Sequence, residues 1–248
     1  MKFGIYSAEG DRRITNEDFV IADQKLGIYI VCDGMGGHAA GEYASLQAGN
    51  YLLDFLRAEL SDDLSEMLVF DVLNRAIDGV NRHVYGLSRS DEAYYGMGTT
   101  ALIAYIAGKQ LYICHVGDSR AYLVDDERAL LLTRDQSYVQ KLVDEGQISE
   151  EEARVHPKRN IVLQAVGTNQ ALQPELLAFD LAANQVVVLC SDGISDALTE
   201  EDMYRIIGEA KSAENAAKML VEKAFLQGSK DDASAIVIGS LPLNRVNI

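Results

Sequence analysis

Three aspartates share one setting: each closes or follows an apolar, strand-like run and has a glycine beside it. They are Asp33 in IYIVCDG, Asp118 in LYICHVGDSR and Asp192 in VVVLCSDG. The end of a buried strand presents a carboxylate rigidly, and the neighbouring glycine lets the backbone approach a ligand and expose its carbonyl. Asp-Gly by itself also marks hairpin turns, but helix-like segments follow Asp33 and Asp192. We therefore interpret the three acids as candidate ligands.

Two more acids can join this set: Asp18, before a strand-like run, and Asp231, at the start of the last one. Carboxylates brought together repel one another unless cations neutralise them. Ligands that offer only oxygen select hard ions, so converging acids predict Mg²⁺ or Mn²⁺. Two such ions, roughly 3.5–4 Å apart, acidify a shared water and clamp phosphate oxygens, which is the chemistry of phosphoester hydrolysis. Arg13, three residues before Asn16, would suit the phosphate because a guanidinium can bind it through two hydrogen bonds.

The elements that must position these residues show both strand and helix periodicity. Strand-like runs lie at Phe3–Ser7, Phe19–Asp23, Ile28–Asp33, Thr99–Ala107, Gln110–Val116, Ala121–Val124, Ala129–Thr133, Leu176–Asp180, Gln185–Cys190 and Ala233–Ile238. Helices are expected at Ala40–Leu60, Leu64–Leu87, Ser137–Glu145, Ser149–Val155 and Ala213–Phe225. Because the strands come in groups, with two long helices between the early and middle ones, the pattern favours an α+β layered domain. The polar stretch Ser137–Asn160 is expected to form a surface subdomain or lid.

The bulk composition indicates one soluble domain. The chain has 248 residues, of which 48% are hydrophobic and 24% charged, and its net charge is −16. Such acidity repels nucleic-acid backbones, so a nucleic-acid partner is not expected. The N-terminal residues lack a secretory pattern, and no run approaches the ~20 apolar residues of a membrane helix, which favours a cytoplasmic location. The three cysteines lie far apart in apolar runs and indicate neither disulfides nor a zinc site.

Six short motifs occur in a definite order along the chain. They are Arg13-x-x-Asn16-Glu17-Asp18, Asp33-Gly34-Met35-Gly36-Gly37-His38, Gly96-Met97-Gly98-Thr99-Thr100, Val116-Gly117-Asp118-Ser119-Arg120, Ser191-Asp192-Gly193 and Asp231-Asp232. Together they resemble the metal-dependent protein serine/threonine phosphatases, the protein phosphatase 2C family, in its compact bacterial form. The resemblance covers residues 1–248 as a single catalytic domain, with a flap at 137–160 beside the site. It implies a four-layer sandwich of two antiparallel β-sheets flanked by helices, with a binuclear metal site at one end.

The resemblance also implies which residues bind two Mn²⁺ or Mg²⁺ ions. Asp33 would bridge both ions, and the carbonyl of Gly34 would bind one of them. Asp192 and Asp231 would be the remaining direct ligands of the other ion. Asp118 would bind a third, weaker ion that it shares with Asp192.

Other residues would act around these ions. Asp18 would hold metal-bound water with support from Glu17, and Arg13 would bind the substrate phosphate. His38 would protonate the leaving seryl or threonyl oxygen, work that suits its ordinary pKa of about 6.5. The alternative for His38 is a polar residue at the start of a helix, whereas His83 and His115 are expected to be structural.

The implied activity is hydrolysis of phosphoserine and phosphothreonine in proteins by a metal-bridged water that attacks phosphorus directly. The substrates would be phosphoproteins modified by a bacterial Ser/Thr kinase, and the enzyme is expected to be a monomer that binds no membrane. Two positions depart from the family pattern: Asp232 stands where asparagine is usual, and His115 where a small or amide residue is commoner. Neither departure removes a metal ligand, so we expect an active enzyme.

Three other classes of protein share features with this sequence. The run Gly34-Met-Gly36-Gly37-His-Ala39 formally fits a dinucleotide-binding fingerprint after a strand. However, Asp54, about twenty residues on, sits in the helical run YLLDFL instead of ending a second parallel strand, and Asp33 would repel a pyrophosphate. A P-loop is excluded because no Gly-Lys-[Ser/Thr] follows the glycines. A catalytically impaired phosphoprotein-binding pseudophosphatase would have lost ligands, and here all the matching aspartates remain.

Overall fold

Two antiparallel sheets form the centre of the computed structural model, which describes residues 1–11, 15–36 and 40–241. The first sheet has the strand order β1-β11-β10-β7-β8, and the second has the order β2-β3-β5-β6-β9 with β4 paired to β3. Their bounds are β1 Phe3–Ala8, β2 Asp18–Asp23, β3 Ile28–Met35, β4 Gly98–Thr99, β5 Ala101–Ala107, β6 Gln110–Val116, β7 Arg120–Val124, β8 Ala129–Leu131, β9 Glu175–Asp180, β10 Val186–Cys190 and β11 Ala233–Ile238.

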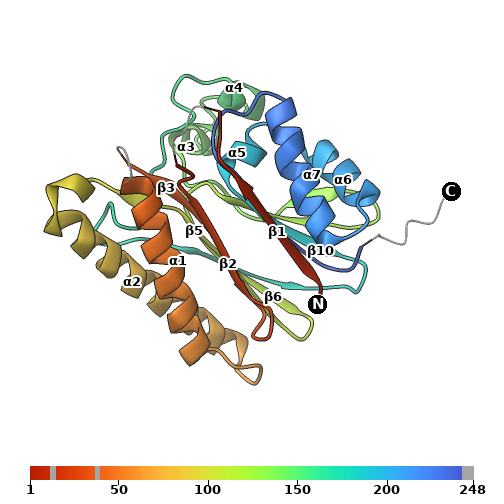
Figure 1. The fold of residues 1–248 in the computed structure, drawn as a ribbon, viewed down its shortest axis with the longest axis horizontal. Helices are drawn as coiled ribbons and strands as arrows, with labels where there is room; N and C mark the ends of the chain where they lie inside the picture. The colour runs from red at the N-terminus through yellow and green to blue at the C-terminus, as the bar shows by residue number, and fades with distance from the viewer. Residues whose placement is uncertain (12–14, 37–39, 242–248) are drawn as a thin grey trace.

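Helices cover the outer face of each sheet. The pair α1 (Ala40–Glu59) and α2 (Glu66–Ser90) packs on the second sheet, and the pair α6 (Glu200–Glu209) and α7 (Ala213–Leu226) packs on the first (Figure 1). Shorter helices are η1 (Glu92–Tyr94), α3 (Tyr138–Asp144), α4 (Glu150–Arg154) and α5 (Asp192–Ser195). The predicted architecture of two antiparallel sheets flanked by helices is confirmed. None of the helices within the described ranges has both the length and the apolarity needed to cross a bilayer.

Side-chain alternation along the strands divides the interior into three cores. In β3, Tyr29 and Val31 point between the two sheets, whereas Ile28, Ile30 and Cys32 point toward α1 and α2. This is the period of two expected of a strand that is buried on both faces. A third core lies between the first sheet and helices α6 and α7. The inter-sheet core therefore determines how the two sheets sit relative to one another.

Two elements of the structure differ from the prediction. The strand predicted at Thr99–Ala107 is divided into β4 and β5 at Thr100. There the N–H of Asp33 donates to the Thr100 side chain instead of to a backbone carbonyl. Helix α6 was not predicted at all. It begins at Thr199, which forms a capping box with Asp202: the Thr199 side chain accepts from the N–H of Asp202, and the Asp202 carboxylate accepts from the N–H of Thr199.

Candidate metal centre

Five predicted acids lie at matching ends of strands from both sheets. Asp18 is the first residue of β2, Asp33 lies near the end of β3, Asp118 lies between β6 and β7, Asp192 follows β10, and Asp231 precedes β11. Because β2 and β3 are antiparallel, the start of one meets the end of the other, and Asp18 lies directly opposite Asp33. The same holds for β10 and β11 in the first sheet, where Cys190 pairs with Ala235.

Threonines from the β4–β5 segment fix the backbone of Asp33. Its N–H donates to Oγ1 of Thr100 at 2.9 Å, and its carbonyl accepts from the N–H of Thr100 at 2.8 Å and from Oγ1 of Thr99 at 2.9 Å. Thr100 also contacts Oγ of Ser119 at 2.7 Å. Thr99, Thr100 and Ser119 are all buried, so these bonds form away from competing water. The sequence motif that contains the two threonines therefore holds a carboxylate-bearing strand in place.

A serine in the first sheet holds the carboxylate of Asp18 in the second. Oγ of Ser191 donates to Oδ2 of Asp18 at 2.6 Å, and the same Oγ accepts from the N–H of Ser234 at 3.0 Å. The N–H of Asp18 donates to Oδ1 of Asn16 at 2.9 Å. The roles of Ser191 and Ser234 were not predicted, because they depend on which strands of the two sheets meet.

The position of Gly34 tolerates no side chain. A Cβ there would lie 2.1 Å from the carbonyl oxygen of Gly41 at the start of α1, and 2.6 Å from that of Glu17. The N–H of Gly34 donates to the same Glu17 carbonyl at 3.0 Å. The glycine beside Asp33 thus allows β2, β3 and α1 to approach closely at the site.

Neighbouring carboxylates help to raise the pKa of two of the predicted acids, Asp33 and Asp192. Burial, followed by the charges of Asp192 and Asp18, raises the pKa of Asp33 well above its usual range. Burial, followed by the charges of Asp118 and Asp231, does the same for the pKa of Asp192. The charges of all four other predicted acids act on Asp33, which therefore lies close to each of them.

The effect on the two outer acids is smaller. Burial raises the pKa of Asp18 to about 7, although hydrogen bonds from Ser191 and Ser234 oppose the shift. Burial and the charge of Asp135 raise the pKa of Asp118 to about 6. At neutral pH these carboxylates gain from a nearby cation, because a positive charge would offset both causes.

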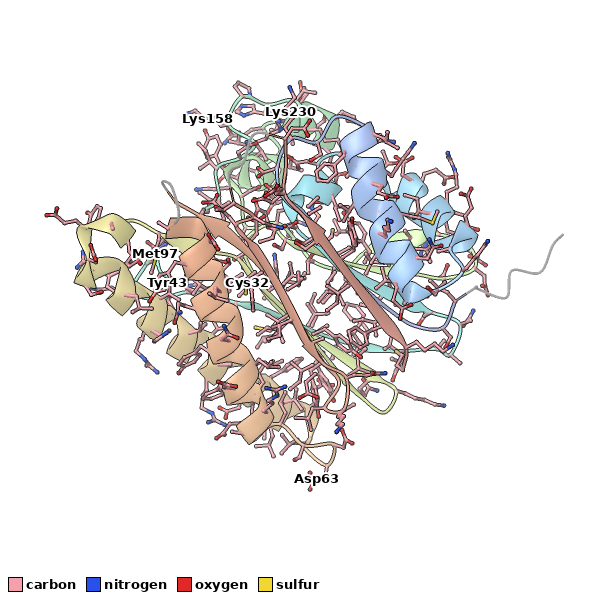
Figure 2. The ribbon with its side chains drawn as sticks, in the orientation of Figure 1. Cys32, Tyr43, Asp63, Met97, Lys158 and Lys230 are labelled. Atoms are coloured by element: carbon pink, nitrogen blue, oxygen red, sulfur yellow. The ribbon has the colours of Figure 1, made fainter. Side chains whose placement is uncertain are left out.

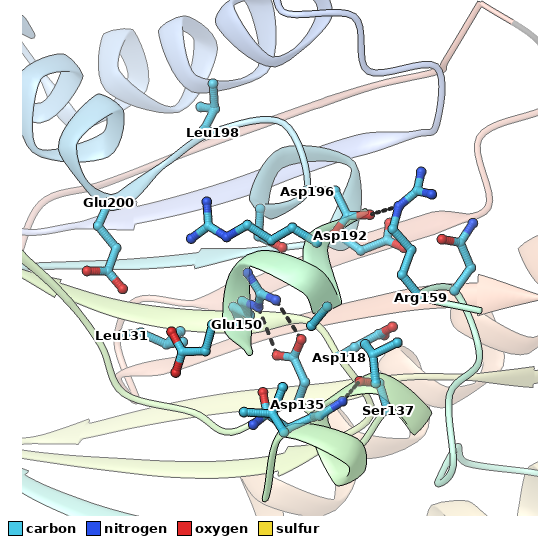
Figure 3. Close-up of a pocket in the computed structure, with 18 of the residues that line it drawn as sticks. Asp118, Leu131, Asp135, Ser137, Glu150, Arg159, Asp192, Asp196, Leu198 and Glu200 are labelled. Carbon is cyan, nitrogen blue, oxygen red and sulfur yellow. Dashed lines mark hydrogen bonds and ion pairs between the residues drawn. The ribbon is translucent and has the colours of Figure 1, made fainter. Parts of the chain in front are cut away.

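A pocket opens beside Asp118 and Asp192 (Figure 3). One wall comes from α3, α4 and the segments beside them, and includes Ser137, Gln140, Arg159 and Asn160. The pocket therefore lies between the carboxylates and the stretch predicted to form a lid.

Two arginines of this pocket pair with acids that were not predicted as ligands. Arg120 binds Asp135 through two hydrogen bonds, of 2.8 and 2.6 Å, and Nε of Arg159 lies 3.7 Å from Oδ2 of Asp196 (Figure 3). These ion pairs fix the two arginines on the pocket wall, where the charge of Arg120 opposes the effect of Asp135 on the pKa of Asp118.

The donor set fits hard divalent cations. Asp18, Asp33, Asp118, Asp192 and Asp231 offer carboxylate oxygen only, and hard ions prefer such ligands. Across the described ranges, no three His, Cys, Asp or Glu side chains already form a compact metal-holding group. The fit therefore rests on the chemistry of the donors and on their mutual repulsion. Arg13 and His38 lie outside the described residues.

Two cysteines and two histidines that were not predicted as ligands lie in packed surroundings. Cys32 points into the core beneath α1 (Figure 2), on the opposite face of β3 from Val31, and burial raises the pKa of its thiol. Burial also raises the pKa of Cys190 to about 12. His83 of α2 stacks on Tyr51, and the buried His115 has Nδ1 3.5 Å from Oε2 of Glu175.

The dinucleotide alternative does not fit the structure. Asp54 lies within α1, and its side chain is 82% exposed on the helix surface. A ribose-binding acid would instead stand at the end of a parallel strand, whereas β3 pairs with antiparallel neighbours on both sides.

Comparison with known proteins gives a consistent result. Residues 8–145 match the family described as Protein phosphatase 2C. A putative protein phosphatase 2C-type of Streptococcus pyogenes serotype M6 is 35% identical over 243 residues, which are 96% of this chain and 97% of that protein. The serine/threonine protein phosphatase PstP of Mycobacterium tuberculosis is 36% identical over 235 residues, 94% of this chain, which spans only 44% of that longer protein.

Solved structures agree in fold. The serine/threonine phosphatase Stp1 from Staphylococcus aureus superposes with a TM-score of 0.89 at 31% identity, covering 98% of this chain and 96% of that one. The catalytic domain of a serine/threonine protein phosphatase PstP, in complex with two manganese ions, has a TM-score of 0.83 at 32% identity and covers 95% and 96% of the two chains. The chain belongs to the protein phosphatase 2C family.

Proposed function

We propose that this protein removes phosphate from phosphoserine and phosphothreonine in other proteins, and that the reaction requires Mn²⁺ or Mg²⁺. The observation that carries the proposal is the set of acids at the strand ends of both sheets, which offer only oxygen ligands and whose charges together raise the pKa of Asp33. Membership of the protein phosphatase 2C family supports the substrate class. The relative solved with two manganese ions supports the cofactor.

The residues at the strand ends would share the ions as follows. Asp33 would contact both ions, the carbonyl of Gly34 would bind one of them, and Asp192 and Asp231 would bind the other. Asp118 would hold a third, weaker ion. When bound, the ions would neutralise the carboxylates, acidify water and stabilise charge on the phosphate.

The chain's own residues would orient the reactants. Asp18, held by Ser191 at 2.6 Å, would accept a hydrogen bond from water at the site. Arg13 would bind the phosphate oxygens, and His38 would protonate the departing seryl or threonyl oxygen. We also propose that the phosphoryl group passes directly to water. The buried cysteines support this, because the raised pKa of Cys32 and Cys190 keeps both thiols protonated and poorly nucleophilic.

The test uses Asp33→Asn and Asp192→Asn, assayed on an aryl phosphate and on a phosphothreonine peptide with Mn²⁺ or with a chelator. Each substitution should lower turnover by more than about 100-fold, because even the loss of an outer-shell partner costs about 10–100-fold. Asp54→Asn, which removes the same charge from the exposed face of α1, should behave as wild type.

Three outcomes separate the rival functions. Full activity in the chelator would reject the metal requirement. Mn²⁺ binding without hydrolysis of either substrate would instead favour the phosphoprotein-binding alternative. Hydrolysis of the aryl phosphate alone would leave a phosphatase but reject phosphoprotein as its substrate.

A further inference from the structure

Asp232, the residue after the candidate ligand Asp231, uses both of its carboxylate oxygens on backbone donors. Oδ1 accepts from the N–H of Gly10 at 3.0 Å, and Oδ2 accepts from the N–H of Glu17 at 2.7 Å. The residue is only 3% exposed, so these bonds replace hydration that the carboxylate has lost. Each of the two oxygens meets its own donor, an arrangement that a carboxylate supplies and that an amide, with a single oxygen acceptor, does not reproduce.

The bond to Glu17 continues into the second sheet. The carbonyl of Glu17 accepts from the N–H of Gly34 at 3.0 Å. Glu17 directly precedes Asp18, and Gly34 directly follows Asp33. A short series of hydrogen bonds therefore runs from the start of β11 to the candidate ligands of β2 and β3.

The backbone of Asp232 also meets the segments that carry the other two acids. Its N–H donates to Oδ1 of Asp231 at 2.9 Å. Its carbonyl oxygen lies where a Cβ on Gly193 would approach to 2.0 Å, so the residue beside Asp192 packs directly against it. Asp232 thus connects four segments, each of which bears one candidate ligand.

We propose that Asp232 is a positioning residue: its two acceptor oxygens clamp the backbone at Gly10 and Glu17, and this clamp keeps the four ligand-bearing segments in the arrangement that binds the divalent ions. The inference rests on the proposed function for the identity of the ligands. In Asp232→Asn the side chain keeps its shape but loses one acceptor, and its NH₂ group then faces a backbone N–H. The clamp on Gly10 or on Glu17 is therefore lost.

The experiment compares wild type with Asp232→Asn and with a matched control, Asp125→Asn. Asp125 also accepts from two backbone N–H groups, those of Glu127 and Arg128, both at 2.9 Å, but in the turn between β7 and β8. Calorimetric titration with Mn²⁺ should show about 10–100-fold weaker binding for Asp232→Asn, the range typical of residues that orient metal ligands. The control should bind as wild type does.

Amide hydrogen exchange in the presence of chelator separates clamping from the mere loss of a charge. In Asp232→Asn the amides of Glu17 and Gly34 should exchange at least about 10-fold faster than in wild type, because the bonds that protect them are weakened. Loss of charge alone would weaken Mn²⁺ binding without exposing these amides, and that outcome would overturn the proposal.

The remaining outcomes also decide the matter. A folded Asp232→Asn protein with wild-type Mn²⁺ affinity would overturn the proposal, since a packing role would survive this isosteric change. If the variant does not fold, exchange is read in wild type: protected amides at Gly10 and Glu17 support the clamp, and free exchange there overturns it. Failure of the proposed function would be recognised by a different result, in which the wild-type protein neither binds Mn²⁺ nor hydrolyses phosphate esters.

Discussion

At the scale of single residues, the site consists of groups that oppose folding when no cation is near. Asp18 and Asp33 lie directly opposite each other in the β2–β3 pair, a position where like charges destabilise a sheet. The charges of Asp118, Asp192 and Asp231 add to this repulsion at Asp33. The structure offsets part of the cost with fixed hydrogen bonds, such as that from Ser191 to Asp18. Residues suited to the chemistry are therefore the ones that make stability depend on pH.

We predict that the metal-free protein loses stability as the pH rises. The pKa of Asp18 is raised to about 7 in the folded chain, against about 3.9 when unfolded, so between these values the folded state binds more protons. Its contribution to stability is complete below pH ~4 and is lost as the pH rises through ~7. Asp118, with a folded pKa of about 6, acts in the same direction. Urea unfolding in chelator should give a smaller free energy of unfolding at pH 7.5 than at pH 5, and added Mn²⁺ should restore it.

A matched pair of variants isolates this effect from the general repulsion of a chain with net charge −16. Asp18→Asn removes the titrating group and should reduce the difference in stability between pH 5 and pH 7.5. Asp54→Asn removes the same charge from an exposed position and should leave the difference almost unchanged. Equal differences in the two variants would contradict the assignment to Asp18.

The residues of this site divide into those the sequence could reveal and those it could not. Asp33 and Asp192 were predictable because an apolar strand next to Asp-Gly is a local pattern. Thr100 and Ser191 were in the quoted motifs, but their partners Asp33 and Asp18 lie 67 and 173 positions away. Such contacts depend on strand register and on how the two sheets pack, which local periodicity does not specify.

At the scale of elements, helix starts give a direct test of the local interactions. Ser212 begins α7, and its side chain accepts from the N–H of Asn215 at 3.1 Å. Ser65 occupies the same position in α2, but within the described structure its side chain makes no capping bond. Ser212→Ala should therefore lower the free energy of unfolding by about 1 kcal/mol, and Ser65→Ala by less than about 0.5 kcal/mol. Urea unfolding measures both, and equal losses would contradict the capping assignment.

The boundaries of helices were predicted well where a long periodic stripe of apolar residues is buried. Helices α1 and α2 have long buried stripes and were expected close to their observed ranges. Helix α6 has only three buried residues, Met203, Ile206 and Ile207, within its ten positions. So short a stripe does not stand out from surrounding acidic residues, although the Thr199–Asp202 capping box was a readable start signal.

At the scale of the whole molecule, the site depends on how the two sheets are placed relative to each other. Asp18 and Asp33 belong to the second sheet, whereas Asp192 and Asp231 flank strands β10 and β11 of the first. The sheets contact through the inter-sheet core, while α6 and α7 pack on the far side of the first sheet. A small shift of one sheet would therefore separate the acids even if each sheet stayed intact.

Adjacent valines in β10 test this dependence. Val187 faces the inter-sheet core and Val188 faces α6 and α7, and both are at most 1% exposed. Each change to alanine removes the same two methyl groups and should cost about 2 kcal/mol of unfolding free energy. Only Val187→Ala leaves its cavity between the sheets, where relaxation moves one sheet toward the other. Calorimetric titration should therefore show weaker Mn²⁺ binding for Val187→Ala than for Val188→Ala. Distance along the chain does not explain this difference, because Val187 lies five residues before Asp192 and Val188 lies four. Equal Mn²⁺ affinities at equal loss of stability would show that the sheets' packing does not control the site.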